Sequence, residues 1–194
     1  MSESQFHVHG PHDHELEHAV QSGGAEHSGM VNQIALFTAI IATVGAVFGY
    51  MGGATQANAG LFKNNAAIKK TEASNQWNYY QAKSSKQNLS ELALELAPAA
   101  KKEFYQGEIE RYKTEKAAIK LEAEKLEAKS IDWDRRSDHE IHIHHRWAQA
   151  TTALQISIAL AAIALLTRKE WMKKIMYLMG SIGVVLGGFA AAQV

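Results

Sequence analysis

Hydrophobic residues gather in three long stretches of the chain, and charged residues are almost confined to the segments before and between them. The three stretches cover residues 30–54, 149–167 and 173–193; the first two contain no charged residue, and the third begins with two lysines. A helix needs about 20 mainly apolar residues to cross the hydrocarbon core of a bilayer. The pattern therefore predicts an all-α membrane protein with three transmembrane helices.

The segment between the first two stretches, residues 55–148, is polar but rich in the good helix formers Glu, Lys and Ala. In its second half, side chains recur at alternating steps of four and three residues, which is the heptad pattern of a coiled coil. Pro98 removes a backbone donor and disfavours helical geometry at Ala97. Because the chain leaves a membrane before this segment and enters one after it, we predict a long antiparallel, coiled-coil-like hairpin that turns near Pro98; a kink there, with a bend elsewhere such as Gly107, is the alternative. The predicted core positions are Tyr105, Ile109, Tyr112, Ile119, Ala123 and Leu126, with Lys116, Ser130 and Trp133 in the same two rows.

Two shorter segments complete the organisation. Residues 1–29 hold six His, five Asp or Glu and no Lys or Arg, which is typical of a flexible tail. Residues 168–172 form a basic loop between the second and third stretches, and Lys and Arg in short loops favour the cytoplasmic side. This places the hairpin in the periplasm and the N-terminus in the cytoplasm, although the basic residues that flank the hairpin argue for the opposite orientation.

Each apolar stretch carries small residues at steps of four, so that they lie on one face of a helix. In a bilayer, small residues at this spacing let two helices approach closely. The pattern predicts that these faces pack the chain into a homo-oligomer. The predicted packing residues are Gly45, Gly49 and Gly53, then Ala153, Ser157 and Ala161, and finally Gly183, Gly187 and Ala191.

The run Gln76-Trp77-Asn78-Tyr79-Tyr80-Gln81-Ala82-Lys83 lies between the glycine-containing first stretch and the Glu/Lys-rich helix. With these neighbours it resembles the bacterial membrane-protein family called domain of unknown function 4337, over most of the chain after Met30. The resemblance implies a bacterial inner-membrane protein with several spans and a helical middle. It brings no assigned activity.

Composition and motifs exclude several function classes. Lys and Arg together number 20, as do Asp and Glu, and the formal net charge is +0. The basic residues alternate with acids rather than forming a basic face, so nucleic acid is not a predicted partner. There is no Cys, which excludes a thiolate nucleophile or metal ligand. No phosphate-binding glycine loop, nucleophile elbow or HExxH motif is present, so the sequence predicts no enzyme.

Two groups of histidines are candidate metal ligands. Neutral imidazoles bind zinc, nickel or copper well. The tail carries His7, His9, His12 and His14, for which a solvated tail without function is the alternative. Just before the second stretch, His139, His142 and His145 follow each other at three-residue steps on one helix face, where an interfacial helix end against lipid head groups is the alternative. No certain cofactor follows from the sequence, and a divalent transition metal is the candidate.

The predicted function is therefore structural: a membrane-anchored coiled-coil protein that assembles with copies of itself and contacts membrane lipids. Transport pathways usually need ionisable groups inside the membrane, and the three stretches lack them except for Lys173 and Lys174 at one edge. The alternative is an oligomeric ion or metal channel, or a metal or pH sensor, that uses the histidine-rich segments.

Overall fold

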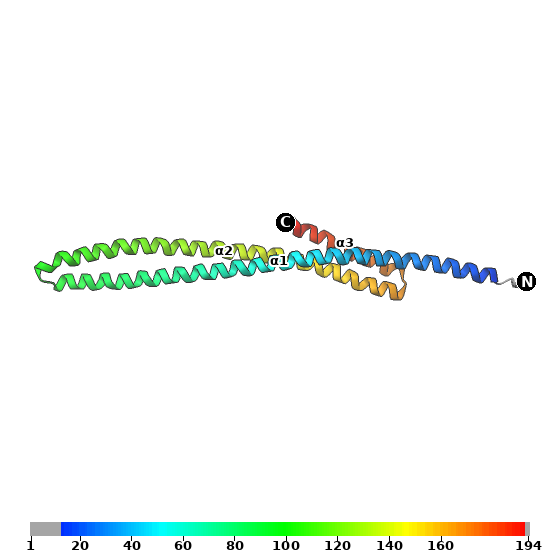
Figure 1. Cartoon of the computed structure of the whole chain (residues 1–194), viewed down its shortest axis with the longest axis horizontal. Coiled ribbons are helices and arrows are strands. Elements are labelled where there is room, and N and C mark those ends of the chain that lie inside the picture. Colours follow the sequence, from blue (N-terminus) through cyan, green and yellow to red (C-terminus); the bar gives the residue numbers. More distant parts are fainter. Residues whose placement is uncertain (1–12, 193–194) are drawn as a thin grey trace, which may run out of the picture. The chain divides into compact units, whose positions relative to one another are not determined.

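The computed structural model describes the chain from Asp13 to Ala192, with side chains from Gly29 onward, and this part contains three α-helices and no strand. The helices are α1, Asp13–Leu96, α2, Ala99–Thr167, and α3, Glu170–Ala191 (Figure 1). The predicted all-α class is thus confirmed for the described residues. Each of the three helices contains a stretch long and apolar enough to cross a membrane.

The breaks between the helices have clear local causes. α1 ends at Leu96 and α2 begins at Ala99, so the interruption falls at Ala97 and Pro98, where the proline ring is incompatible with a continuing helix. The amide of Lys101 donates to the carbonyl of Pro98 (2.9 Å) and starts the first turn of α2. At the other end, α2 stops at Arg168, which has the left-handed φ of 54°.

Contacts divide the chain into two compact units. The charged unit comprises Gly53–His144, and the apolar unit comprises the chain before and after it. α1 begins at Asp13, which lies inside the segment for which the sequence predicts a flexible tail. Both α1 and α2 contribute to both units, whereas α3 belongs only to the apolar unit.

The core of the apolar unit joins all three helices. Ile34 of α1, Ala161 and Ala164 of α2, and Met172 and Met176 of α3 form one buried cluster. Two aromatic rings on its edge, Phe37 and Tyr177, meet edge to face with their centroids 4.6 Å apart. The hydroxyl of Ser157 is completely buried and donates to the carbonyl of Met176 (2.8 Å). A buried hydroxyl in an apolar environment needs such a partner, so this bond ties α2 to α3.

Candidate functional site

In the charged unit, α1 and α2 lie side by side and meet through small residues (Figure 1). Ala59, Ala66 and Ala73 of α1 follow each other at steps of seven residues, and all three are almost completely buried. The hydroxyl of Ser137 donates to the carbonyl of Ala59, and that of Ser130 donates to the carbonyl of Ala66, each at 2.9 Å. Seven residues forward along α1 therefore correspond to seven residues backward along α2. This contact needs small residues on both helices, because hydroxyl-to-backbone bonds form only where the helix axes are close.

The side of this contact contributed by α2 coincides with the heptad rows found in the sequence. Ile109, Tyr112, Ile119, Ala123 and Leu126 are all at most 9% exposed, and Tyr105 is half-buried. The rows continue through Ser130 and Ser137. Sequence reasoning missed the partner row on α1, although the spacing of Ala59, Ala66 and Ala73 by seven residues was available as a signal.

Farther from the serines, the two helices are joined by charged and aromatic side chains. Lys83 Nζ lies 2.5 Å from Glu115 Oε2, which is shielded from solvent, and its ammonium also lies over the rings of Tyr79 and Tyr112, 5.2 and 5.5 Å from their centroids. The hydrogen bond and positive charge of Lys83 lower the pKa of Glu115 below its ordinary value. The same hydrogen bond raises the pKa of Lys83. This pair thus places opposite charges within the contact between the two helices.

Lys116, the polar residue of the predicted heptad rows, is accommodated in a similar way. Its Nζ donates to the side-chain oxygen of Gln87 on α1 (3.0 Å), and it lies 5.2 Å from the centre of the Tyr80 ring. A lysine at a core position normally lowers coiled-coil stability and fixes the register of the helices. Here the amide and the aromatic ring of α1 supply the specific partners that such a register requires.

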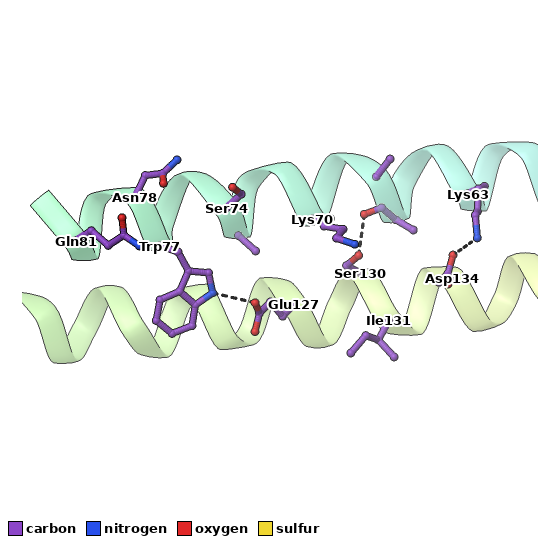
Figure 2. A pocket seen from close by; sticks show the side chains of 13 residues that line it. Lys63, Lys70, Ser74, Trp77, Asn78, Gln81, Glu127, Ser130, Ile131 and Asp134 are labelled. Carbon is purple, nitrogen blue, oxygen red and sulfur yellow. Dashed lines mark hydrogen bonds and ion pairs between the residues drawn. The ribbon is translucent and has the colours of Figure 1, made fainter.

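A groove of about 830 Å³ runs along one face of the charged unit between α1 and α2 (Figure 2). Three hydrogen bonds cross it: Lys63 Nζ donates to Asp134 Oδ1 (2.5 Å), the indole N–H of Trp77 donates to Glu127 Oε1 (2.9 Å), and the hydroxyl of Ser130 donates to the carbonyl of Ala66 (2.9 Å). Lys70 extends toward α2 beside Ser130 in Figure 2 and has no ion pair among the described residues. The groove is lined by both polar and apolar side chains, and most of its exposed lining surface is apolar.

Residues of the run Gln76–Lys83 divide between this groove and the helix contact. Trp77, Asn78 and Gln81 line the groove. The ring of Trp77 meets that of Tyr80 edge to face at 5.7 Å, and Tyr80 in turn covers Lys116 of α2. The aromatic residues of this run therefore act as packing anchors between the helices.

The histidines predicted as metal ligands are not gathered in the part of the chain that the structure describes. Within it, no group of three His, Asp or Glu side chains is close enough to hold a metal ion. His139, His142 and His145 are exposed, whereas Ile143 and Trp147 on the same helix are buried. Of the histidines in the tail, His7, His9 and His12 lie outside the described residues, and the side chain of His14 does too.

The small residues predicted to pack one copy against another have two different environments. Several are used inside a single chain: Ala153, Ser157 and Ala161 are buried, and a Cβ on Gly183 or Gly187 would collide with Leu154 or Phe48. Gly45 faces Leu154, 3.8 Å away. By contrast, Gly49, Gly53 and Ala191 are exposed, and nothing lies within 4 Å of a Cβ placed on Gly49 or Gly53. Contacts within the chain thus already account for the small size of the first group.

Comparison with known proteins agrees with the resemblance seen in the Trp77 region. The family model described as "Domain of unknown function (DUF4337)" matches residues 30–193. No curated protein and no solved structure matches the chain. The match confirms the resemblance and covers both units, and the description assigns no activity.

Proposed function

Since the chain belongs to the family of domain of unknown function 4337, which carries no assigned activity, we propose a function from the geometry: a membrane anchor that holds an antiparallel helical hairpin and assembles with copies of itself. In this proposal the apolar unit lies in the bacterial inner membrane. The charged unit is the interaction module. The role is structural rather than enzymatic.

The outward-facing surface of the apolar unit supports a position in lipid. Large apolar side chains point away from the core along α1, including Leu36, Ile40, Val47 and Tyr50, which are each more than half exposed. In water, such a continuous apolar surface would promote association or aggregation. In a bilayer it meets acyl chains, and away from the helix ends the backbone groups of these spans are paired within a helix.

The paired helices of the charged unit support the hairpin. The bonds Ser137–Ala59 and Ser130–Ala66 define one register, and the ion pair Lys83–Glu115 has nearly the same register farther along. The break at Pro98 falls where a turn is needed. A module of two paired helices offers an elongated surface rather than an enclosed substrate pocket. This favours an interaction role.

The observation that carries the assembly proposal is a face of small residues on α1. These residues follow each other at alternating steps of four and three, so they form a heptad stripe, and all are exposed in a single chain. A stripe of Ala and Gly lets membrane helices approach closely enough for extensive van der Waals contact. Its members are Ala35, Ala39, Ala42, Ala46 and Gly49.

The test is the particle mass of the full chain in a mild detergent, compared between two variants. Gly49→Leu adds a large side chain to the stripe, and because nothing within the chain lies near that position, the single chain accepts it. We expect this variant to lose subunits relative to the native protein. Val47→Leu, at an exposed position on another face of α1, is the control and should keep the native mass. A native particle that contains one chain, or equal masses for both variants, would remove the stripe from any interface.

A further inference from the structure

A second cavity lies in the apolar unit, between α1 and the end of α2. It has a volume of about 320 Å³, which is within the range of about 300–1,000 Å³ typical of ligand pockets. Its lining comes from the start of the apolar part of α1 and from the end of α2. The residues are Met30, Val31, Asn32, Ile34, Ala164, Leu165 and Arg168.

The lining of this cavity has an apolar part and a polar, positively charged part. Val31, Ile34, Ala164 and Leu165 offer only apolar surface, and Ile34 and Ala164 belong to the buried core of the unit. The polar side chains are the cation Arg168 and the amide Asn32, both of them exposed. A ligand that fits must therefore combine an apolar portion with a polar, negatively charged one.

Arg168 occupies a position at which its side chain is costly. Its φ of 54° is left-handed, a conformation that helix ends usually give to Gly or Asn because other side chains are strained there. Its amide still closes the last turn of α2 by donating to the carbonyl of Ala164 (2.9 Å). Gly would make the same backbone bond without strain, so the local fold does not require a guanidinium at this position. Strained residues of this kind often mark functional sites.

The surrounding charge is one-sided. Lys169 and Lys174 are close to Arg168 in sequence, and neither they nor Arg168 form an ion pair with any described residue. Glu170 is the only acid in this loop, and it is already paired with Lys173 (2.9 Å). Among the described side chains this end of the cavity therefore carries positive charge that no acid pairs, which complements an anion.

We propose that this cavity binds one anionic glycerophospholipid, with the phosphodiester on Arg168 and Asn32 and an acyl chain against Val31 and Leu165. The inference rests on the membrane location proposed above. Arg168 directly follows the last residue of the second apolar stretch, and Met30 begins the first, so the cationic end of the cavity lies where lipid head groups would be. Basic pockets between membrane helices are a known position for anionic head groups, and the guanidinium fork matches a phosphate in geometry.

The experiment titrates the full chain, purified in a neutral detergent, with phosphatidylglycerol or phosphatidylcholine of the same acyl chains, and counts bound lipids by native mass spectrometry. We expect the first phosphatidylglycerol to bind at least about tenfold more tightly than phosphatidylcholine, a factor that corresponds to about 1.4 kcal/mol. Arg168→Gln should abolish this preference. The control Arg146→Gln removes an exposed arginine near the other end of the second apolar stretch and should keep the preference.

Two further measurements test whether the lipid preference comes from the whole lipid and from the side chain of Arg168. Inorganic phosphate at the same concentration should not displace the lipid, because it has nothing to place in the apolar part. Arg168→Gly should lose the preference while its thermal midpoint stays equal or rises, since the strain at φ 54° is relieved. Equal affinities for the two lipids, equal losses in Arg168→Gln and Arg146→Gln, displacement by phosphate, or a lower midpoint for Arg168→Gly would each overturn the site. A native chain that fails to sediment with membranes would overturn the proposed anchor instead, and this is measured separately.

Discussion

Ser130 donates its hydroxyl to the main-chain carbonyl of Ala66 at 2.9 Å, across 64 positions of sequence. Both residues are buried, and the same kind of bond recurs seven residues later on α2 and seven residues earlier on α1, between Ser137 and Ala59. A side chain as short as serine reaches the backbone of another helix only when the two helices are in close contact. This pair of bonds fixes both the spacing and the register of α1 and α2 in the charged unit.

The close contact makes a strong prediction for Ala66→Leu. The larger side chain would have to occupy the space in which Ser130 reaches the α1 backbone, so the helices must separate or shift. We expect a loss of stability of about 1–3 kcal/mol, which is typical of overpacking in a well-packed interface. The measurement is thermal unfolding followed by circular dichroism at the helix band.

Ala82→Leu is the matched control, because Ala82 lies on the same helix and is exposed. Its thermal midpoint should stay close to that of the native chain. If Ala66→Leu and Ala82→Leu unfold at the same temperature, the small-residue contact does not hold the two helices together.

Two neighbouring glycines of α3 give a prediction for the apolar unit. A Cβ on Gly187 would collide with the ring of Phe48 on α1, whereas nothing lies within 4 Å of a Cβ on Gly188. Gly187→Ala should therefore destabilise the unit by about 1–3 kcal/mol. Gly188→Ala should be neutral or slightly stabilising, because Ala is the better helix former. Thermal unfolding in detergent, with both variants side by side, checks this; equal midpoints would contradict the packing of α3 on α1.

The ion pair between Lys83 and Glu115 predicts a dependence of stability on pH. Lys83 lowers the pKa of Glu115 below its ordinary value of 4.5, so the carboxylate stabilises the fold above that value, and this contribution is lost as the pH falls through the lower folded pKa. Glu115→Gln should lower the thermal midpoint near neutral pH. Well below 4.5 the difference between variant and native chain should become smaller.

Glu110→Gln is the control for this pair, because Glu110 is a highly exposed acid whose partner Lys113 lies 3.4 Å away on the same helix. Exposed pairs of this kind contribute little. If the difference in thermal midpoint between Glu115→Gln and the native chain stays constant from neutral to acid pH, the negative charge of Glu115 does not contribute to the stability of the fold.

The alternative function, a metal or pH sensor, is tested by measuring whether the histidines before the second apolar stretch bind metal. The full chain with its six N-terminal histidines replaced by Gln is titrated with zinc, with and without His139, His142 and His145 also changed to Gln. The structural account predicts the same calorimetric heat for both. Stoichiometric zinc uptake that disappears with the triple change, and on acidification below about pH 6.5, would favour the sensor.

Hydrophobic patterning and Pro98 predicted an all-α chain with three apolar spans and a break near Pro98, but they did not predict that α1 begins as early as Asp13. The heptad rows of α2 were visible because Ile109, Ile119 and Leu126 are large and apolar. The opposite row was not recognised, because Ala59, Ala66 and Ala73 stand among other alanines and glycines, and alanine is common on any helix face. Only a partner helix distinguishes a packed alanine from an exposed one.

For the small residues of the apolar stretches, too, spacing in the sequence did not predict which ones are packed against another helix. A step of four placed Gly45 and Gly49 in one row, yet Gly45 packs on Leu154 and Gly49 is exposed, because residues four apart are rotated by about 40° around a helix. Gly183 and Gly187 are small because Leu154 and Phe48 lie against them, which no spacing rule reveals. The cavity beside Arg168 was equally invisible, since it joins two segments that are far apart in sequence.

The central claim is that three spans anchor the hairpin, so that the turn at Pro98 and the loop at Lys169 lie on opposite sides of one membrane. The chain has no native Cys, so single cysteines at Ala99 and Lys169 can be probed with a membrane-impermeant thiol reagent, in bacterial cells whose outer membrane has been made permeable. We predict that Ala99→Cys is labelled in intact cells and that Lys169→Cys is labelled only after lysis. The reverse pattern would invert the orientation, and labelling of both positions in intact cells, or of neither, would contradict the three-span anchor.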